Sequence, residues 1–405
     1  MELTSGSRVA IVGGGPAGAF TAYFLLDLAQ KVGLDLSVDI YEPKPFYLTG
    51  PGGCNLCGGV ISESLVQLLA TEGIHLPSEV IIDTIDAYTL HTPGESARIH
   101  ATVDEHRIAS IYRGGGPRGS ESQNPLPWDS FDWFLLRLAV GLGARHIPLR
   151  VKNLDWDGGK PRVHTESSLP QTYDLLVGAL GLNAPALKLF TQLGFGYQPP
   201  RSARAWIGEL YYGQEQVEKM LGNAMHIFLL DTPGLQFAAL TPKGHYATLI
   251  VLGKQVNQAL VQQVLQDPEL RALFPPGWEI PVLPCDCQPR IQIGDPRNPF
   301  GDRVVMVGDC SVSRLYKDGI GAAYRTAKAC ALTAITHGVS KEAFRRYYAP
   351  TCATLSWDNR IGHLLFGLDG AFKRFPFFRR ALISVVRWEQ QQPPPPFPAP
   401  PPPPF

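Results

Sequence analysis

The feature that most constrains this 405-residue chain is a glycine-rich turn between a short apolar run and an amphipathic segment. Residues 9–12 have the continuous apolar character of a buried parallel strand, and apolar side chains then recur at a helical period through residue 28. Between them, Gly13 permits a tight turn, Gly15 lets a diphosphate approach the backbone, and Gly18 lets the helix pack closely on the strand. The turn therefore predicts a strand, a phosphate-binding loop and a helix.

An acidic residue follows at the spacing that a dinucleotide site requires. Residues 36–40 alternate as a second strand and lead to Glu42. A carboxylate at about 20 residues beyond the glycines accepts hydrogen bonds from a ribose, while the diphosphate rests on the free N–H groups of the helix N-terminus. Strand, glycines, helix, strand and acid in this order favour a bound dinucleotide over a glycine-rich turn without a ligand.

The composition is that of a globular protein and excludes some classes of function. Hydrophobic residues make up 44% and charged residues 18%, and 36 basic residues balance 36 acidic ones, so we expect no nucleic-acid partner. The sequence shows neither an apolar N-terminal signal segment nor a run of about 20 apolar residues that would span a membrane. Seven cysteines, an odd number, do not suggest a disulfide scaffold, so a reducing cytoplasm is the expected location.

Two further segments show the buried-strand pattern, on either side of a region with a different pattern. Residues 173–178 form one of these segments, and residues 303–307, which lead into Gly308 and Asp309, form the other. Residues 200–283 instead carry aromatic and β-branched runs separated by turns, which favours an antiparallel sheet. The predicted fold class is α/β: a discontinuous Rossmann-like nucleotide-binding domain with an inserted antiparallel-sheet substrate domain and C-terminal helices.

The last of these segments indicates which nucleotide binds. Asp309 is placed to accept a ribityl hydroxyl, and a glycine-rich turn at Gly319 and Gly321 then opens a helix. The N–H groups of that turn can stabilise the negative edge of a reduced isoalloxazine. Residues 174–183 resemble the Asp-x-x-x-Gly-Ala-x-Gly-x-Asn segment of the para-hydroxybenzoate hydroxylase-like flavoproteins. FAD is therefore the predicted cofactor.

Among those flavoproteins, the chain resembles the geranylgeranyl reductase family over about residues 8–335. Two segments carry the resemblance: the loop at residues 51–60, with its Cys54 and Gly-Gly pair, and the helical segment from Phe131-Asp132 to Gly143-Ala144. Taken with the fingerprint, the resemblance implies FAD contacts at Gly13, Gly15, Pro16, Ala17, Gly18, Glu42, Pro43, Gly53, Cys54, Val151, Gly308, Asp309, Gly319, Ile320 and Gly321.

The resemblance and the strand patterns together divide the chain. The FAD-binding domain is expected at residues 1–79, 106–195 and 285–338, and the substrate domain at residues 80–105 and 196–284. A C-terminal helical region is expected at 339–389, followed by a proline-rich disordered tail at 390–405. Within the helical region, residues 360–388 combine basic and aromatic side chains, so they are expected either to contact a membrane peripherally or to cap the substrate domain.

The chain departs from the family in two places, and it offers no separate site for a pyridine nucleotide. Trp128 replaces the arginine usually found shortly before the Phe-Asp pair, which puts one FAD contact in doubt. Residues 234–244 correspond to the strand that lines the isoprenoid cavity, but with fewer aromatic side chains. No second strand–glycine–helix fingerprint is present, so NADPH must dock transiently or a ferredoxin-like protein must supply electrons.

The cysteines leave several interpretations open. Three interpretations concern Cys54, Cys57, Cys285 and Cys287. In the first they are isolated thiols near the flavin, and in the second two of them form a redox-active pair. In the third they bind zinc or an iron–sulfur cluster. The Cys-x-Cys spacing at Cys285 is atypical of metal sites, so no metal is predicted. The remaining cysteines are expected to be small buried packing residues: Cys310, Cys330 and Cys352.

The predicted reaction is reduction of a C=C bond of an apolar, isoprenoid-like substrate by hydride from reduced flavin. Cys54 is the first candidate for tuning the flavin or donating a proton, and His226 and Tyr246 are weaker candidates from the substrate domain. The alternative enzyme is an FAD-dependent monooxygenase that acts on a small or lipophilic substrate. The non-enzymatic alternative is an FAD-stabilised, membrane-associated scaffold that recruits partners through its proline tail.

Overall fold

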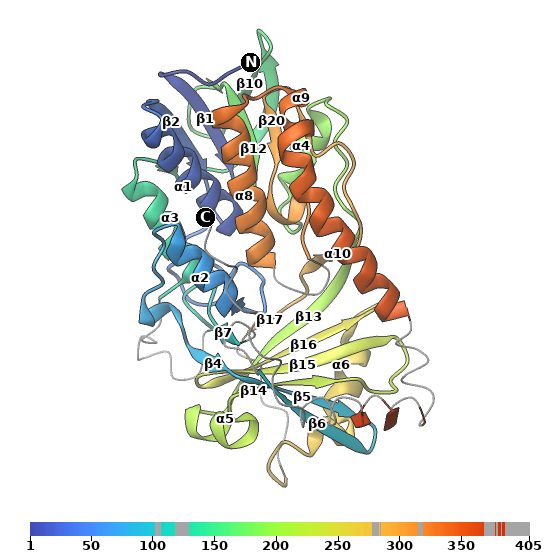
Figure 1. Ribbon diagram of the computed structural model, residues 1–405. Coiled ribbons are helices and arrows are strands. Elements are labelled where there is room, and N and C mark those ends of the chain that lie inside the picture. The colour runs from blue at the N-terminus through green and yellow to red at the C-terminus, as the bar shows by residue number, and fades with distance from the viewer. Residues whose placement is uncertain are drawn as a thin grey trace, which may run out of the picture.

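The computed structural model describes residues 1–101, 107–117, 129–277, 283, 285–314, 319–367, 377, 380, 381, 383 and 384. Trp128, the proline-rich tail and most of residues 360–388 lie outside the described residues, so the expectations for them stay predictions. Figure 1 shows an upper part built on a parallel sheet and a lower part built on an antiparallel sheet. Among the described residues, no helix has both the length and the apolar character needed to cross a membrane.

A six-stranded sheet organises the upper part. In spatial order its strands are β19 (Phe300–Gly301), β20 (Val304–Met306), β12 (Leu175–Gly178), β1 (Ser7–Val12), β2 (Leu36–Tyr41) and β8 (Arg145–Ile147). β1 pairs in parallel with β2 on one side and β12 on the other, and β12 pairs in parallel with β20. The four apolar runs of the sequence therefore meet in one sheet, with their carboxyl ends at the same edge.

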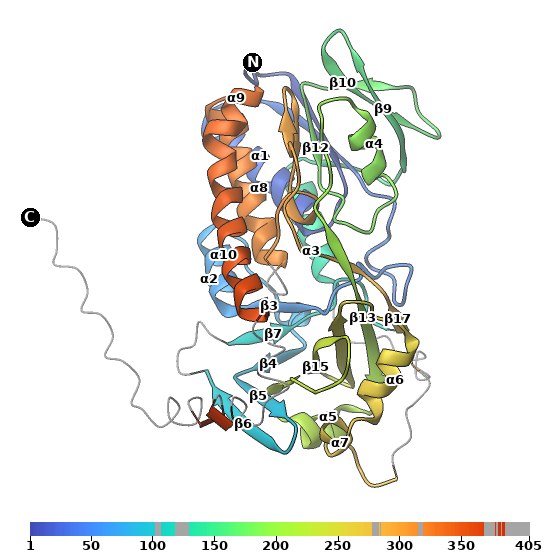
Figure 2. The same ribbon diagram turned by 90° about the vertical axis from the view of Figure 1, so that its right-hand side faces the viewer.

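Helices cover one face of this sheet and a small sheet covers the other (Figure 2). Val9 and Ile11 point into the core on the helical face, whereas Ala10 and Val12 point into the opposite core, as the strand pleat requires. Burial on both faces explains why these strands are continuous apolar runs. The covering elements are α1 (Pro16–Lys31), α3 (Phe131–Gly141) and α8 (Gly319–Thr336) on one side, and α4 (Leu187–Gln192), β9 (Val151–Asp157), β10 (Lys160–Thr165) and β11 (Gln171–Thr172) on the other.

An eight-stranded sheet organises the lower part, and its pairs are antiparallel apart from β5 with β14. In spatial order the strands are β17 (Cys285–Cys287), β13 (Ser202–Tyr211), β16 (Tyr246–Gly253), β15 (Leu235–Lys243), β14 (Ala224–Phe228), β5 (Ala87–Thr92) and β6 (Glu95–His100), with β18 (Arg290–Gln292) beside β13. One face packs on α5 (Gln214–Leu221), α6 (Gln258–Gln266) and α7 (Pro268–Arg271). The predicted fold class is confirmed, while the exact domain boundaries stay a prediction.

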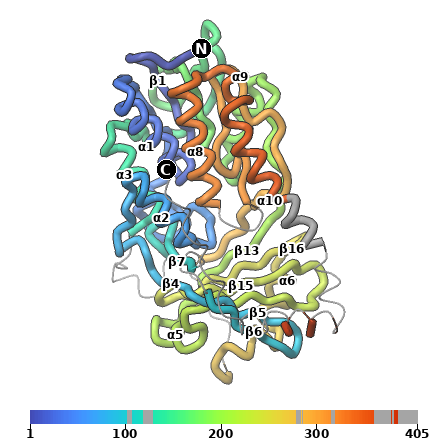
Figure 3. The backbone as a smooth tube through the Cα atoms, viewed as in Figure 1, coloured from blue at the N-terminus to red at the C-terminus, as the bar shows by residue number. Residues whose placement is uncertain are grey.

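A third sheet lies between the two parts, as the backbone trace in Figure 3 shows. It contains β3 (Val60–Ser62), β7 (Ile108–Ser110) and β4 (Asp83–Ile85), and α2 (Glu63–Thr71) follows β3. A 3-10 turn, η1 (Ser78–Val80), precedes β4, and in it the Val80 N–H donates to the Pro77 carbonyl.

The C-terminal helices run beside α8 (Figure 2). They are α9 (Lys341–Ala343), the π-helical turn η4 (Phe344–Tyr348) and α10 (Ala349–Gly367). The Tyr348 hydroxyl donates to the Met306 carbonyl at 2.7 Å, which ties this layer to the end of β20. The C-terminal helices therefore support the sheet edge at which the candidate site lies.

Candidate functional site

The glycine-rich turn has the geometry that a phosphate-binding loop needs. Gly13 has a φ of +108°, and a Cβ there would overlap the Ala179 carbonyl. A Cβ at Gly18 would overlap the Gly13 carbonyl, so the first turn of α1 lies directly against the end of β1. Gly15 forms the N-terminal cap of α1 and no described side chain satisfies the N–H groups of the first turn. These donors are available to an anion.

Glu42 folds back onto this turn. One carboxylate oxygen accepts from the Gly14 N–H at 2.9 Å and the other accepts from the Lys44 N–H at 2.8 Å. Burial is the largest influence on the carboxyl and raises its pKa, although both hydrogen bonds oppose that effect. The carboxylate therefore lies at the mouth of the turn, in the place predicted for a group that binds a ribose.

Arg113 was not predicted, yet it lies beside the same turn. Its guanidinium forms two hydrogen bonds with the Asp132 carboxylate, at 2.8 and 3.1 Å, and Asp132 also accepts from Asn55 at 2.6 Å. A Cβ at Gly15 would lie 2.8 Å from the Asn55 amide nitrogen and 3.6 Å from the Arg113 guanidinium. The chain therefore presents an arginine near the N-terminus of α1. This arginine comes from the segment after β7 and not from position 128.

The turn at Gly308 packs against the glycine-rich turn at the start of α1. Gly308 has a φ of +67°, its N–H donates to Thr326 at 3.0 Å, and a Cβ there would lie 2.7 Å from the Ala17 side chain. Asp309 follows in the 3-10 turn η3 (Gly308–Cys310), and a Cβ at Gly319 would lie 3.5 Å from its carboxylate. Burial raises the pKa of Asp309. The predicted diphosphate and ribityl contacts thus come together at one sheet edge, with Ile320 and Gly321 buried in the first turn of α8.

The cysteine-containing loop is tightly turned. Lys44 donates to the Cys54 carbonyl at 2.6 Å, and the Leu56 N–H donates to the Cys54 sulfur at 3.3 Å. Leu56 has a φ of +51°, an uncommon conformation for a residue other than glycine. A Cβ at Gly53 would overlap the Leu48 carbonyl, so the loop can close only with glycine there. Burial raises the pKa of the Cys54 thiol, which favours the protonated form.

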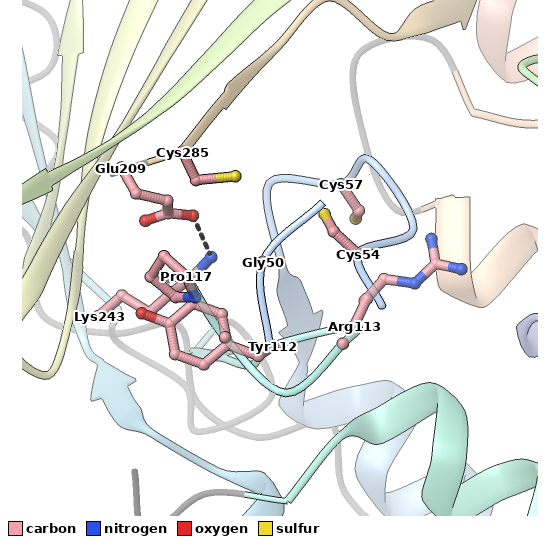
Figure 4. A pocket seen from close by; sticks show the side chains of 11 residues that line it. Gly50, Cys54, Cys57, Tyr112, Arg113, Pro117, Glu209, Lys243 and Cys285 are labelled. Carbon is pink, nitrogen blue, oxygen red and sulfur yellow. Dashed lines mark hydrogen bonds and ion pairs between the residues drawn. The ribbon is translucent and has the colours of Figure 1, made fainter. Parts of the chain in front are cut away.

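A cavity separates this loop from the eight-stranded sheet (Figure 4). Figure 4 shows Glu209, Lys243 and Cys285 entering from the sheet, with Cys54 and Cys57 on the loop opposite them. The lining residues are Gly50, Cys54, Cys57, Tyr112, Arg113, Gly114, Gly116, Pro117, Glu209, Lys243 and Cys285.

On the sheet face toward this cavity, the side chains of directly paired residues form rows that cross the strands. Strand pairing places one polar row across four strands, formed by Cys285, Glu209, Thr248 and Thr241. The next row is mostly apolar, formed by Cys287, Ile207, Ile250, Ala239 and Ile227. Since directly paired residues share a face, the cavity wall is polar along one line and apolar along the next. A Cβ at Gly58 would lie 2.6 Å from Ile250, so the loop touches the apolar row.

Comparisons with known proteins agree with this arrangement. No family model matches the chain. A curated relative, geranylgeranyl diphosphate reductase from Synechocystis sp., is 25% identical over 93% of this chain and 88% of its own. The structure of a geranylgeranyl bacteriochlorophyll reductase-like protein from Thermoplasma acidophilum superposes with a TM-score of 0.67 at 14% identity, covering 95% of this chain and 92% of that one. The chain is therefore similar in sequence to one geranylgeranyl reductase and shares the fold of a second, reductase-like protein.

Two other flavoproteins of known structure also share the fold of this chain. The flavin-dependent brominase Bmp2 has a TM-score of 0.67 at 15% identity, with 94% of this chain and 93% of that one covered. A probable FAD-dependent monooxygenase from Pseudomonas aeruginosa has a TM-score of 0.63 at 15% identity, with 94% and 99% covered. Both neighbours are flavoproteins, and the glycine turn, Glu42 and the buried Asp309 of this chain fit the predicted FAD.

The remaining predicted residues are two predicted FAD contacts, Val151 and Pro43, and two weaker catalytic candidates, His226 and Tyr246. Val151 lies in the core between β9 and the parallel sheet, together with Tyr41, and Pro43 is exposed directly after Glu42. His226 was expected to line the cavity, but it lies on the opposite face of the sheet, because it pairs with Leu240 of the helix-facing core. There its ring nitrogen lies 2.9 Å from that of His91. Tyr246 is buried at the end of β16, on the cavity side and against Tyr211.

The seven cysteines of the chain are all free thiols. Cys54, Cys57 and Cys285 line the cavity, and Cys287 lies one row further along β17. Within the described ranges, no group of three or more histidine, cysteine or acidic side chains is placed to hold a metal ion. Cys310 and Cys330 are buried, as predicted for packing residues, and Cys352 is half-buried.

Proposed function

We propose that this oxidoreductase reduces a C=C bond of an apolar, isoprenoid-like small molecule and that Cys54 donates the proton. The supporting observation is the position of the Cys54 thiol. It lies between the three turns that fit FAD and a sheet face with an apolar row, and burial raises its pKa so that the thiol is protonated near neutral pH.

The cofactor contacts belong to the same proposal. The N–H groups around Gly15 to Gly18 and the Arg113 guanidinium would bind the diphosphate, and Glu42 would bind the adenosine ribose. Asp309 would accept a ribityl hydroxyl, and the first turn of α8 would face the pyrimidine edge of the ring. When bound, reduced FAD supplies a hydride, which carries both electrons of the reduction.

The protein would supply orientation and the proton. The apolar row of Ile207, Ile250, Ala239 and Ile227 would hold the hydrocarbon and exclude water from it. The S–H bond of Cys54 would break as its proton forms a C–H bond on the carbon next to the one that accepts hydride, and solvent would then return a proton to the thiolate. Either NADPH docking transiently or a ferredoxin-like protein would reduce the cofactor.

An anaerobic single-turnover experiment tests the proposal. The FAD-loaded full chain is reduced with dithionite and mixed with geranylgeranyl diphosphate or an unsaturated polyprenol. Flavin reoxidation is followed by absorbance, and the gain of two hydrogens by mass spectrometry. We expect Cys54→Ala to slow product formation by about a hundredfold or more, as loss of a general acid does. Cys330→Ala, a buried thiol in α8, serves as the control.

Two results would overturn the proposal. In the first, no unsaturated isoprenoid reoxidises the flavin without oxygen, whereas NADPH is consumed rapidly with oxygen and the product gains oxygen, which is the behaviour of a monooxygenase. In the second, Cys54→Ala and the control reduce the substrate at the same rate, which removes Cys54 from the reaction while leaving the reductase activity in place.

A further inference from the structure

We propose that Lys243 is a positioning residue: paired with Glu209, its ammonium holds loop 54–59 against the eight-stranded sheet and thereby fixes the Cys54 thiol at the cavity wall. The inference concerns the thiol that the proposed function uses, and so rests on that function for its significance. Its test needs no turnover, however, and can succeed or fail independently of the reaction.

The side chain of Lys243 is enclosed between the sheet and the loop. It is 1% exposed, and its ammonium donates to the Gly58 carbonyl at 3.0 Å and to the Glu209 carboxylate at 3.3 Å. The other oxygen of Glu209 accepts from the Thr248 hydroxyl at 2.8 Å. One ammonium therefore joins the loop backbone to a carboxylate that is itself oriented by the neighbouring strand (Figure 4).

The backbone of the loop is shaped to receive this ammonium. Gly59 has a φ of +69°, and a Cβ there would lie 2.8 Å from the Lys243 nitrogen and would overlap the Ile111 carbonyl. Since any side chain at Gly59 would displace the ammonium, this glycine serves the contact as well as the turn. The Gly59 N–H donates to the Cys57 sulfur at 3.3 Å, so the contact extends into the thiol-bearing part of the loop.

The same ammonium also contacts the segment after β7, which leads to the predicted diphosphate cradle. It lies 4.8 Å from the centre of the Tyr112 ring, a cation–π distance. Tyr112 directly precedes Arg113, whose ion pair with Asp132 lies over the helix N-terminus. At the other end, Asp83 accepts from the N–H of Gly244, so β4 fixes the hairpin tip on which Lys243 lies. Lys243 therefore connects the substrate-side sheet to both cofactor-side segments.

Stability alone does not account for this pair. Transfer of two charges out of water usually offsets their attraction, and replacing a buried pair with apolar residues of similar volume is often neutral or stabilising. Removal of one partner alone, in contrast, leaves a buried charge without compensation. A pair placed where three segments meet is better explained by the geometry that it imposes on the loop.

The ammonium also acts on the thiol through space. Lys243 and Lys44 both lower the pKa of Cys54, against the larger effect of burial. The ionisable and charged groups around the thiol are Lys44 from the segment after β2, Cys57 from the loop, Tyr112 and Arg113 from the segment after β7, and Glu209, Lys243, Cys285 and Cys287 from the sheet. Removal of the ammonium should therefore move the titration of Cys54 to higher pH.

The test compares the FAD-loaded full chain with Lys243→Met/Glu209→Leu, which removes both charges together and so avoids a lone buried charge. The control is Lys254→Met, the same substitution at an exposed lysine after β16. Hydrogen exchange of loop 54–59 is measured by mass spectrometry. Alkylation of Cys54 by iodoacetamide is followed by peptide mapping as a function of pH.

In the double variant we expect loop exchange to become about tenfold faster, comparable to loss of a hydrogen bond from a charged donor. The pH midpoint of Cys54 alkylation should rise, and both readouts should be unchanged in Lys254→Met. A loop that exchanges at the original rate, or an alkylation profile that does not move in the folded double variant, would overturn the proposal. Lys243→Met alone is expected to destabilise the fold, so the double variant decides the outcome.

Discussion

Arg113 and Asp132 form a two-point ion pair, at 2.8 and 3.1 Å, between the strand-side segment after β7 and the first turn of α3. The Asp132 side chain is fully buried and that of Arg113 is 15% exposed. Because the pair lies against Gly15, its guanidinium can offer its remaining donors to a phosphate while the carboxylate fixes its orientation. Under the proposed function, the pair would therefore couple the stability of the fold to the binding of the cofactor.

Asp132→Asn should destabilise the protein strongly. The substitution leaves the guanidinium of Arg113 largely buried beside a neutral amide, and loss of one partner of a buried pair costs about 3 kcal/mol. Asp27→Asn is the control, because Asp27 pairs with the exposed Lys31 and such surface pairs contribute less than about 1 kcal/mol. Urea unfolding of both variants measures the difference. Equal free energies of unfolding would show that the Arg113–Asp132 pair is not important for stability.

Much of the fold could be predicted because its evidence is local. A short stretch of sequence is enough to predict the strand and helix around Gly13, the strand that leads to Glu42 and the strand that leads to Gly308. Because these strands are parallel, their carboxyl ends meet at one edge of the sheet. Arg113 could not be found in this way. It is 19 residues from Asp132, across a polar stretch with no periodicity, and only the fold brings the two together.

The candidate residues in the lower sheet show a second reason why the sequence alone could not predict the site. His226 was placed on the cavity side, yet a strand presents alternate residues to opposite faces and the sequence did not fix which face was which. Lys243 and Glu209 come from distant strands, so their meeting depends on strand register. A lysine directly after Pro242, at the end of a mostly apolar strand, was the available sign of a buried charge.

Gly18→Ala should disrupt the turn, whereas Gly141→Ala should not. A methyl group at Gly18 would overlap the Gly13 carbonyl, so α1 must shift away from β1 and the diphosphate cradle must open. Nothing lies within 4 Å of a methyl group at Gly141, at the end of α3. There the substitution should stabilise the protein by up to about 1 kcal/mol. Thermal unfolding and bound-flavin absorbance check both variants, and normal FAD content in Gly18→Ala would contradict the assigned geometry.

Glu42→Gln should weaken FAD far more than FMN. The carboxylate accepts from two backbone N–H groups and faces the predicted adenosine ribose, a part of the ligand that FMN lacks. Loss of the charge from a hydrogen-bonded carboxylate should raise the dissociation constant for FAD about tenfold or more. Fluorescence titration with each flavin measures this. A parallel loss of affinity for both flavins would place the role of Glu42 elsewhere.

The stacked histidines of the lower sheet should make the protein sensitive to acid. His91 and His226 are buried with their rings 5.1 Å apart, and burial lowers both pKa values, that of His91 to about 4 from an ordinary 6.5. Above pH 6.5 the His91 imidazole is neutral in both the folded and the unfolded chain, so its contribution to the free energy of unfolding does not change with pH. As the pH falls below 6.5 the unfolded chain binds the proton first, and the free energy of unfolding decreases until the folded state also binds it near pH 4.

His91→Asn should flatten the curve of unfolding free energy against pH across this window, whereas His75→Asn, at an exposed position, should leave its shape unchanged. Urea unfolding at a series of pH values measures the three curves, and an unaltered slope in His91→Asn would assign the acid sensitivity to other groups.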